Sequence, residues 1–292
     1  MDNGNEMRDF LVSRRAKLTP DQAGLPAYGG NRRVAGLRRE EVALLAGVSI
    51  DYYTRLERGR AAGVSDSVLE GIARALQLDE AERAHLFDLA RAAGPATPRV
   101  PRRLAPQQVR PSVRRILDSM TAPAFVRNAR LDILAANRLG AALLAPVINS
   151  PAQPANNARF LFLDPAAPAF FQDWERQAQD VVAMLRTEAG HSPHDKALSN
   201  LVGELSTRSD HFRTWWAAHN VRFHRTGVKR FHHPVVGDLT LTYEALDLAA
   251  DAGLRISAYS AEPGTPSEDA LKLLDSWAAT PAEAGPGSER SA

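Results

Sequence analysis

The spacing of apolar residues in the first third of the chain predicts five short helices. The buried stripe of the first helix contains Met7, Phe10, Leu11 and Leu18. Further helices are predicted over 37–46 and 49–58, from about 66 to 76, and from 79 to the Gly94-Pro95 pair. Asp79 with Glu82 forms the capping-box pattern that starts the fifth helix. These elements predict one compact all-α domain over residues 6–93.

After residue 112 the pattern changes to a mixture of helices and strands. Residues 239–243 alternate apolar and polar positions with period two, and Gly237-Asp238 is predicted as the hairpin turn between strands 231–236 and 239–246. A final helix from about Ser267 is expected to bury Leu271, Leu274 and Trp277. Other predicted elements are strands 124–126, 131–135 and 254–259, a loop at 146–157, and helices 113–120, 137–144, 172–188, 194–205 and 210–219. Residues 112–278 are therefore predicted to form an α+β domain with an antiparallel sheet.

Two segments lack an apolar period. Residues 94–111 hold five prolines and four arginines but no acidic residue, which predicts a stiff, extended linker. Its charge is consistent both with contact to a phosphate backbone and with an ordinary solvated linker. Residues 279–292 are rich in Ala, Pro, Glu, Gly and Ser, a composition typical of a disordered tail.

Composition narrows the class of protein. The 292-residue chain is 44% apolar and is therefore long enough for two cores. It holds no cysteine, which excludes disulfides, thiolate zinc sites and cysteine nucleophiles. Residues 1–8 lack the apolar core of a signal peptide, and no stretch approaches the ~20 apolar residues of a membrane span. We therefore expect a soluble cytoplasmic protein with no membrane partner.

Charge is distributed unevenly between the two predicted domains. Residues 1–115 carry 20 Lys and Arg against 14 Asp and Glu, whereas the remainder carries 16 against 20. A positive half joined to a negative half is typical of a nucleic-acid-binding module attached to a module with another task. An ordinary solvated surface has the same excess, so charge alone leaves both interpretations open.

Residues 41–57 have the spacing of a tight helix-turn-helix. Ala43 lets two helices approach closely, and four residues later Gly47 can adopt the left-handed conformation that ends a helix. Val48 is expected to fill the corner, Ser49 to cap the next helix, and Tyr53 with Leu56 to pack inward. A purely structural corner has the same pattern, but its place in a basic five-helix domain favours DNA binding. The residues then predicted to face DNA are Ser49, Ile50, Asp51, Tyr52, Thr54, Arg55 and Arg58.

These side chains suit double-stranded operator DNA. Arg55 can donate to guanine or phosphate, Tyr52 and Thr54 can donate to phosphate oxygens, and Ile50 can contact a thymine methyl. Because helix-turn-helix proteins usually dimerise, we expect a homodimer formed through the second domain and an operator with two related half-sites. The competing hypothesis is an adaptor that uses the same helices to bind another protein.

Longer motifs resemble known families. Phe10-Leu-Val-Ser-Arg-Arg, Gly36-Leu-Arg-Arg-Glu-Glu-Val and Ala46-Gly-Val-Ser-Ile-Asp-Tyr-Tyr are similar to the Xre and lambda-repressor-like helix-turn-helix. Leu161-Phe-Leu-Asp-Pro, Phe212-Arg-Thr-Trp-Trp and Gly227-Val-Lys-Arg-Phe-His-His-Pro resemble the MmyB-like regulators. The resemblance implies a lambda-repressor-like five-helix domain followed by a PAS-like domain that senses a small apolar or fatty-acid-like ligand. The chain departs from the pattern at Ala136, where tryptophan is expected, and at Val64, where proline is usual.

Candidate ligand contacts in the second domain are large aromatic and cationic side chains. The aromatic residues either fill the core or line a pocket, and the cations of 219–233 either hold a ligand carboxylate or lie on a solvated sheet edge. The residues predicted to contact a ligand are Trp215, His219, Phe223, Lys229 and Tyr243.

No catalytic motif is visible in the sequence. The chain has no G-x-S-x-G elbow, no P-loop, and no G-x-G-x-x-G after a strand. A metal site is disfavoured because no HExxH-like pair is present, and because His232 and His233 would point to opposite faces of a strand. The residues weighed for such a site are His219, His224, His232, His233 and Glu244. We therefore expect neither an enzyme nor a cofactor nor a metal site.

Overall fold

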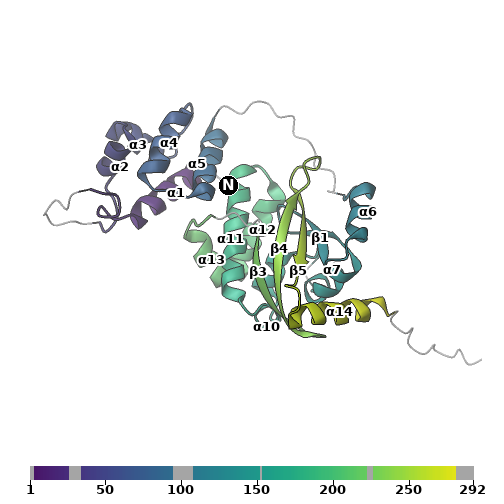
Figure 1. Cartoon of the computed structure of the whole chain (residues 1–292). Helices are drawn as coiled ribbons and strands as arrows, with labels where there is room; N and C mark the ends of the chain where they lie inside the picture. The colour runs from purple at the N-terminus through teal and green to yellow at the C-terminus, as the bar shows by residue number, and fades with distance from the viewer. Residues whose placement is uncertain (1–2, 26–33, 95–107, 152, 222–225, 281–292) are drawn as a thin grey trace, which may run out of the picture. The chain divides into compact units, whose positions relative to one another are not determined.

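The computed structural model of the chain describes residues 3–25, 34–94, 108–151, 153–221 and 226–280 (Figure 1). The chain divides into two compact units, the first formed by residues 1–105 and 178–224, the second by residues 106–177 and 225–292. The domain limits predicted from the sequence, 6–93 and 112–278, stay predictions. Most of the predicted linker and nearly all of the predicted tail lie outside the described residues.

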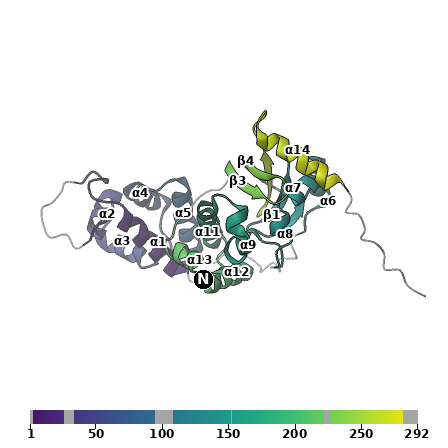
Figure 2. The same cartoon turned by 90° about the horizontal axis from the view of Figure 1, so that it is seen from below.

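Five helices form the N-terminal part of the first unit (Figures 1 and 2). They are α1 (Asn3–Lys17), α2 (Arg39–Ala46), α3 (Ile50–Glu57), α4 (Asp66–Ala75) and α5 (Glu80–Ala93). Their shared core contains Phe10, Leu11, Tyr53, Leu56 and Ile72, all buried. The prediction of a five-helix domain is confirmed, because the apolar spacing that defines each helix also defines the face that it buries.

Local sequence determines where these helices begin and end. The Ser49 hydroxyl accepts a hydrogen bond from the Tyr52 backbone N–H at 3.1 Å and so caps α3. Asp79 Oδ1 accepts from the Glu82 N–H at 2.8 Å, and the Glu82 carboxylate accepts from the Asp79 N–H at 3.2 Å. Gly47 ends α2 with a φ of 70°, a left-handed conformation that favours glycine. The predicted helix-turn-helix geometry is therefore present.

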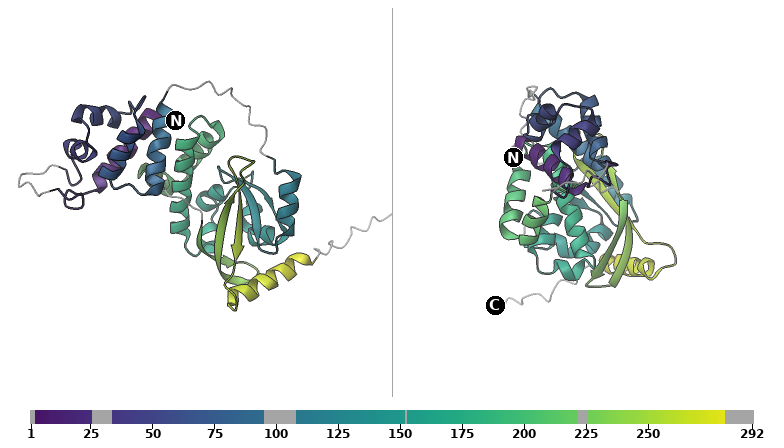
Figure 3. Two further views of the ribbon diagram at one scale, coloured as in Figure 1. Left: turned by 45° about the horizontal axis from the view of Figure 1, so that its top comes forward. Right: turned by 90° about the vertical axis from the view of Figure 1, so that its left-hand side faces the viewer.

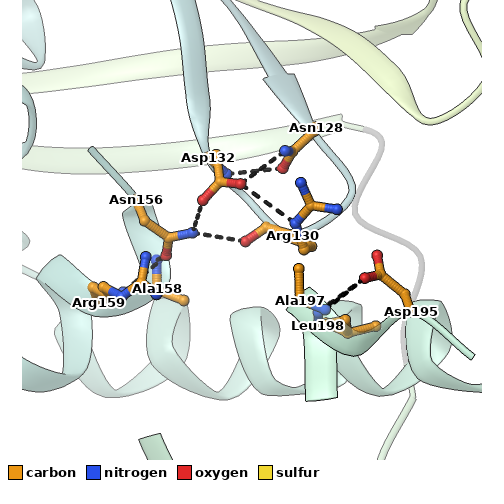
Figure 4. A network of polar contacts seen from close by, with 9 residues as sticks. All are labelled: Asn128, Arg130, Asp132, Asn156, Ala158, Arg159, Asp195, Ala197 and Leu198. Atoms are coloured by element: carbon orange, nitrogen blue, oxygen red, sulfur yellow. Dashed lines mark hydrogen bonds and ion pairs between the residues drawn. The ribbon is translucent and has the colours of Figure 1, made fainter. Parts of the chain in front are cut away.

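Three further helices complete the first unit. They are α11 (Trp174–His191), α12 (Lys196–Arg208) and α13 (Asp210–Ala217). In Figures 1 and 3, α11 lies beside α5. Asp195 caps α12 by accepting from the Ala197 and Leu198 N–H groups (Figure 4). The division between the two units falls inside α11, after Gln177.

The second unit is built on an antiparallel five-stranded sheet with strand order β2-β1-β5-β4-β3. Figure 3 shows two further views of the ribbon. The strands are β1 (Ala124–Asn128), β2 (Ile133–Ala136), β3 (Thr226–His233), β4 (Gly237–Asp247) and β5 (Leu254–Ser260). The helices of this unit are α6 (Pro111–Ser119), α7 (Arg138–Leu143), α8 (Ala145–Ile148), α9 (Asn157–Leu163), α10 (Ala167–Phe170) and α14 (Pro266–Ala279). The predicted α+β class with an antiparallel sheet is thus confirmed.

Different elements pack against the two faces of the sheet. On the outer face, Val113 and Leu117 of α6 pack against Val126 and Ile256. The outer face of β3 and β4 is largely open, and Val228 on it is 52% exposed. On the inner face, Phe170 at the end of α10 contacts Phe231 with ring centroids 5.5 Å apart. The inner face carries Phe125, Arg127, Lys229, Phe231, Leu241, Tyr243, Ser257 and Tyr259.

Three predicted details are corrected. His233 pairs with Gly237, so the hairpin turn lies at 234–236 and not at Gly237-Asp238; Pro234 has no N–H to continue the ladder. The predicted loop 146–157 contains most of α8, which is a single helical turn. Pro146 lies in the first positions of this turn, where a proline is tolerated because its missing N–H is not needed. Trp277 is 53% exposed, because Leu271 and Leu274 already form the buried side of α14. The prediction that His232 and His233 point to opposite faces is confirmed, since only His233 is buried.

A buried polar network closes the connection from β1 to β2 (Figure 4). Asn128 Nδ2 donates to Asp132 Oδ2 at 2.8 Å, and the Asp132 N–H donates to Asn128 Oδ1 at 3.0 Å. Asn156 Nδ2 donates both to Asp132 Oδ1 at 2.7 Å and to the Arg130 carbonyl at 2.8 Å. Asn156 Oδ1 also caps α9, so one side chain connects the loop before α9 to the sheet.

Candidate functional sites

The face of α3 that the sequence predicted to contact DNA is accessible. Ser49, Ile50, Asp51, Arg55 and Arg58 are exposed, and Tyr52 and Thr54 are partly exposed. The opposite face of α3 carries Tyr53 and Leu56, which are buried in the five-helix core. The helix therefore presents its polar and cationic side chains outward while its apolar side holds it in place.

Arg55 and Tyr52 form a pair on this face. The Arg55 guanidinium lies over the Tyr52 ring at 4.7 Å from its centroid. A cation–π contact limits the rotamers of a long arginine side chain without occupying its N–H donors. The pair therefore presents several donors in a restricted orientation.

A cationic hollow lies next to this face. It is lined by residues of α1, α2 and α3 and by the residue that follows α3, namely Asn5, Arg8, Val12, Arg15, Arg39, Glu57 and Arg58. Glu57 is buried, and its carboxylate accepts from Arg15 Nε at 2.7 Å and from Arg39 Nε. The single acid of the lining is thus bound to two arginines, and the hollow keeps a net positive charge. Of its arginines, sequence analysis singled out only Arg58; an anion such as a phosphate suits the hollow.

The residues predicted to contact a ligand do not form one cluster within either unit. Trp215 and His219 belong to the first unit, and Lys229 and Tyr243 belong to the second. Phe223 and His224 lie outside the described residues. Lys229 Nζ lies 5.2 Å from the centroid of Tyr243 and 6.0 Å from that of Tyr259, so these three side chains meet on the inner face.

Sequence analysis missed Arg127, the most unusual residue of the inner face. It is 6% exposed, and its Nε donates to Ser257 Oγ at 3.3 Å. Among the described residues, no carboxylate lies within ion-pair distance of its guanidinium. Asp247, the acid on the neighbouring part of the face, binds Arg255 instead. The available signal was an arginine that directly follows the three apolar residues 124–126 in a short strand.

The electrostatics of Arg127 indicate an unfavourable environment for a lone cation. Burial and then the nearby Arg255 lower its pKa to about 10. Burial raises the pKa of Tyr259, which lies on the same face. A buried guanidinium without a carboxylate is costly, and an anion placed beside it would offset that cost. The inner face therefore combines aromatic surface with an unsatisfied positive charge.

His219, one of the residues predicted to contact a ligand, lies among side chains of the first unit. Arg186 Nη1 is 2.9 Å from its Nδ1, and because an arginine can only donate, this ring nitrogen accepts. Burial, Arg186 and Arg14 lower the pKa of His219 to about 4, which keeps the ring neutral. The His219 ring is thus bound to Arg186, which belongs to the same unit.

Neither a metal-binding cluster nor a membrane-spanning helix occurs in the described parts of the chain. Within them, no group of three or more His, Cys, Asp or Glu side chains is placed to hold a metal ion. No helix among the described residues has the length and apolar character needed to cross a bilayer.

Comparison with protein families identifies two regions of the chain. Residues 30–86 match a helix-turn-helix domain, a span that contains α2, α3 and α4. Residues 109–274 match the MmyB-like transcription regulator ligand binding domain, and this match covers more than half of the 292 residues. No curated protein matches the chain.

Proposed function

The chain belongs to the MmyB-like transcription regulators, and from this premise we propose that it is a bacterial, sequence-specific regulator that senses a small apolar acid. The observation that carries the proposal is the exposed polar face of α3 inside the matched helix-turn-helix region. DNA is the partner that such a face fits best, because an outward helix with an arginine and several hydroxyls matches the donors and acceptors of the major groove.

We propose that α3 enters the major groove of the operator. Arg55, restrained over Tyr52, would donate to a base edge or to a phosphate, and Ile50 would contact a thymine methyl. Ser49 keeps its hydroxyl on the Tyr52 N–H, so its contribution is to hold the first turn of α3 in shape. Direct contact by Asp51 is restricted to donors such as the cytosine amino group.

The cationic hollow would bind the DNA backbone next to the groove. Arg8, Arg39 and Arg58 border it, and Glu57 is occupied by Arg15 and Arg39. Phosphate contacts of this kind position a helix without reading sequence, and they make binding sensitive to salt. This assigns base recognition to Arg55 and backbone positioning to the hollow.

The proposed ligand is an apolar molecule with an acidic group, such as a fatty acid. Arg127 supports this, because its buried guanidinium lacks a carboxylate among the described residues. Arg127 shares the inner face with aromatic rings, of which Phe125 stacks on Tyr259 with centroids 6.1 Å apart. An apolar chain would lie against the rings while its carboxylate binds Arg127. Such a ligand also fits the PAS-like fold that we propose for this domain.

We also propose that the protein is a homodimer and acts in the cytoplasm. A homodimer would present two α3 helices to two half-sites about one turn of DNA apart. An Xre-type regulator of this kind acts in the cytoplasm, where the operator lies. We propose that the protein regulates rather than catalyses, in line with the two domain types that it contains.

Selection of DNA fragments tests the proposed function. The full-length protein is incubated with fragments of its own genome at moderate salt, and the recovered fragments are sequenced. A recurring two-part motif is expected. Binding to that motif is then measured by fluorescence anisotropy for Arg55→Ala and for the control Arg74→Ala, which removes the same charge from an exposed position on α4.

The expected result is a loss of about tenfold or more for Arg55→Ala and less than about twofold for Arg74→Ala. No enriched motif, or equal losses for the two variants, would contradict the proposal. The adaptor hypothesis would then be favoured.

A further inference from the structure

The first unit joins DNA-binding helices to helices of the matched ligand-binding region through a buried arginine. Arg186 of α11 is 1% exposed, although it is charged. Its Nη1 donates to Glu6 Oε2 of α1 at 2.6 Å, and its Nη2 donates to the Trp216 carbonyl at the end of α13. The guanidinium also lies 4.0 Å above the centroid of the Trp216 ring. One side chain thus connects α1, α11 and α13.

A second arginine makes the reciprocal connection from the DNA-binding side. Arg14 of α1 donates from Nη1 to Glu82 Oε1 of α5 at 2.5 Å. Its Nη2 donates to the His219 carbonyl and to Asn220 Oδ1, the latter at 3.3 Å. His219 has a φ of 52°, unusual for a residue other than glycine. The strained backbone places its carbonyl where Arg14 can reach it.

The surface between the two arginines is closely packed. His85 of α5 is buried and sits edge-on to Phe10, with centroids 5.1 Å apart. Gly190 of α11 faces the His85 ring, and a Cβ at this position would lie 2.6 Å from Cε1. Only a glycine lets α11 approach α5 this closely. We call the contact formed by Arg186, Arg14, Glu6, His85 and Gly190 the α11 clamp.

The residues of the α11 clamp are not the ones proposed to contact DNA. Its residues on the DNA-binding side come from α1 and α5, whereas the predicted DNA contacts are on α3 and are exposed or partly exposed. The clamp therefore does not compete with DNA for the same atoms. It can act on DNA binding through the position of α1, which carries Arg8 and Arg15 of the cationic hollow, and through the helices that pack against α1.

The other end of α11 lies in the second unit. The helix begins at Trp174, and its first four residues are grouped with the sheet that carries Arg127. The remainder of α11 is grouped with the five N-terminal helices. A single continuous helix thus belongs to both units and is suited to transmit a change from one to the other.

We propose that the α11 clamp is the relay of this regulator: it makes α11–α13 move with the DNA-binding helices, so that ligand occupancy alters DNA affinity through α11. This inference rests on the proposed function. In several proteins a buried polar or ionic group fixes one geometry rather than adding stability, and a relay requires such a fixed geometry. A relay needs two arrangements that the ligand and the DNA each favour differently.

Hydrogen exchange and DNA binding of the full-length chain test the relay. Arg186→Met removes the positive charge and keeps the apolar stem of the side chain. Glu6→Gln neutralises the carboxylate that binds Arg186 and keeps its size. Arg208→Met is the matched control, because Arg208 is an exposed arginine of α12 whose partner among the described residues is Glu204 of the same helix. The probe for DNA binding is the fragment recovered by the genomic selection.

The relay predicts that Arg186→Met and Glu6→Gln speed amide exchange about tenfold or more in both α1 and α11, while β3 to β5 keep their protection. DNA affinity should change by about fivefold or more in these variants, but not in Arg208→Met. Unchanged exchange in α1 would overturn the clamp. Faster exchange with unchanged DNA affinity would overturn the relay while leaving the clamp in place. A selection that recovers no DNA overturns the proposed function and the relay together, and the exchange data still report on the clamp.

Discussion

Arg15 of α1 donates from Nε to Glu57 Oε1 in the last turn of α3 at 2.7 Å. Glu57 is 2% exposed, and its second oxygen accepts from Arg39 at the start of α2. A single buried carboxylate thus connects the three helices that surround the proposed DNA face. Buried ion pairs of this kind orient helices with respect to one another.

Removing this carboxylate should destabilise the five-helix domain. Glu57→Ala leaves Arg15 largely buried without its anion, which costs about 3 kcal/mol in the free energy of unfolding. The control Glu40→Ala removes an exposed acid whose Arg38 partner is 3.4 Å away, and should cost less than about 0.5 kcal/mol. Urea unfolding measures both; equal losses would show that the Glu57 ion pairs contribute nothing specific.

Two serines at helix starts should differ in their contribution to stability. Ser49 accepts a hydrogen bond from the Tyr52 N–H, whereas Ser65, which precedes α4, makes no such capping bond. Ser49→Ala is expected to cost about 1 kcal/mol in the free energy of unfolding, and Ser65→Ala less than about half of that. Chemical denaturation of the two variants measures both losses. Equal losses would indicate a general effect of removing a hydroxyl and not the loss of a helix cap.

Two helical glycines should respond to alanine with opposite signs. A Cβ at Gly71 of α4 would lie 2.7 Å from the Ala46 carbonyl, so Gly71→Ala should destabilise by more than about 1 kcal/mol. A Cβ at Gly203 of α12 meets nothing within 4 Å, so Gly203→Ala should stabilise by about 0.5–1 kcal/mol through helix propensity. The melting temperatures of the two variants should therefore move apart, and a fall in both would refute the assignment for Gly203.

Stability should fall with acidity in part because of His85. Burial, and then Arg186, lower its pKa to about 3, against about 6.5 in an unfolded chain. Below pH ~6.5 His85 is therefore protonated in the unfolded chain but stays neutral in the folded chain. The free energy of unfolding declines until the pH nears 3. His85→Leu should make this decline shallower by up to about 1.4 kcal/mol per pH unit, measured by urea unfolding between pH 7.5 and 5.

His191 supplies a control of the opposite sign. The Asp88 carboxylate, whose Oδ2 lies 3.7 Å from His191 Nδ1, stabilises the protonated ring and raises the pKa of this exposed histidine. His191 therefore adds stability below its unfolded pKa and loses that contribution as the pH rises through its folded value. His191→Asn should therefore leave the acid-induced decline unchanged or slightly steeper. A shallower decline in this variant would contradict the assignment of the two histidines.

Arg127 should lower stability in the ligand-free protein and increase affinity for an acid. Arg127→Met removes a buried cation, so it should raise the free energy of unfolding by about 1 kcal/mol or more.

Dodecanoate should raise the melting temperature of the unaltered protein more than dodecanol does, and Arg127→Met should lose this difference. Arg114→Met, at an exposed position paired with Asp118, is the control that should retain it. Equal effects of acid and alcohol on the unaltered protein would show that Arg127 does not select an anion.

The sequence by itself determined the helix-turn-helix region and the class of the second domain. Gly47, Ser49 and the Asp79–Glu82 pair act on their own turns, so their effects can be recognised from neighbours in the chain. The alternation in 239–243 likewise identified the strand that is β4, because period two indicates a half-buried strand wherever its partners lie.

Only the tertiary structure decided which side chains meet across long separations. Arg127 becomes an isolated buried cation only because β1 pairs with β5, and Arg186 becomes a clamp only because α11 lies on α1 and α5. Trp277 is exposed because two leucines on its helix already cover the buried side. Burial and charge pairing depend on residues about 130 to 180 positions away, which no local pattern records.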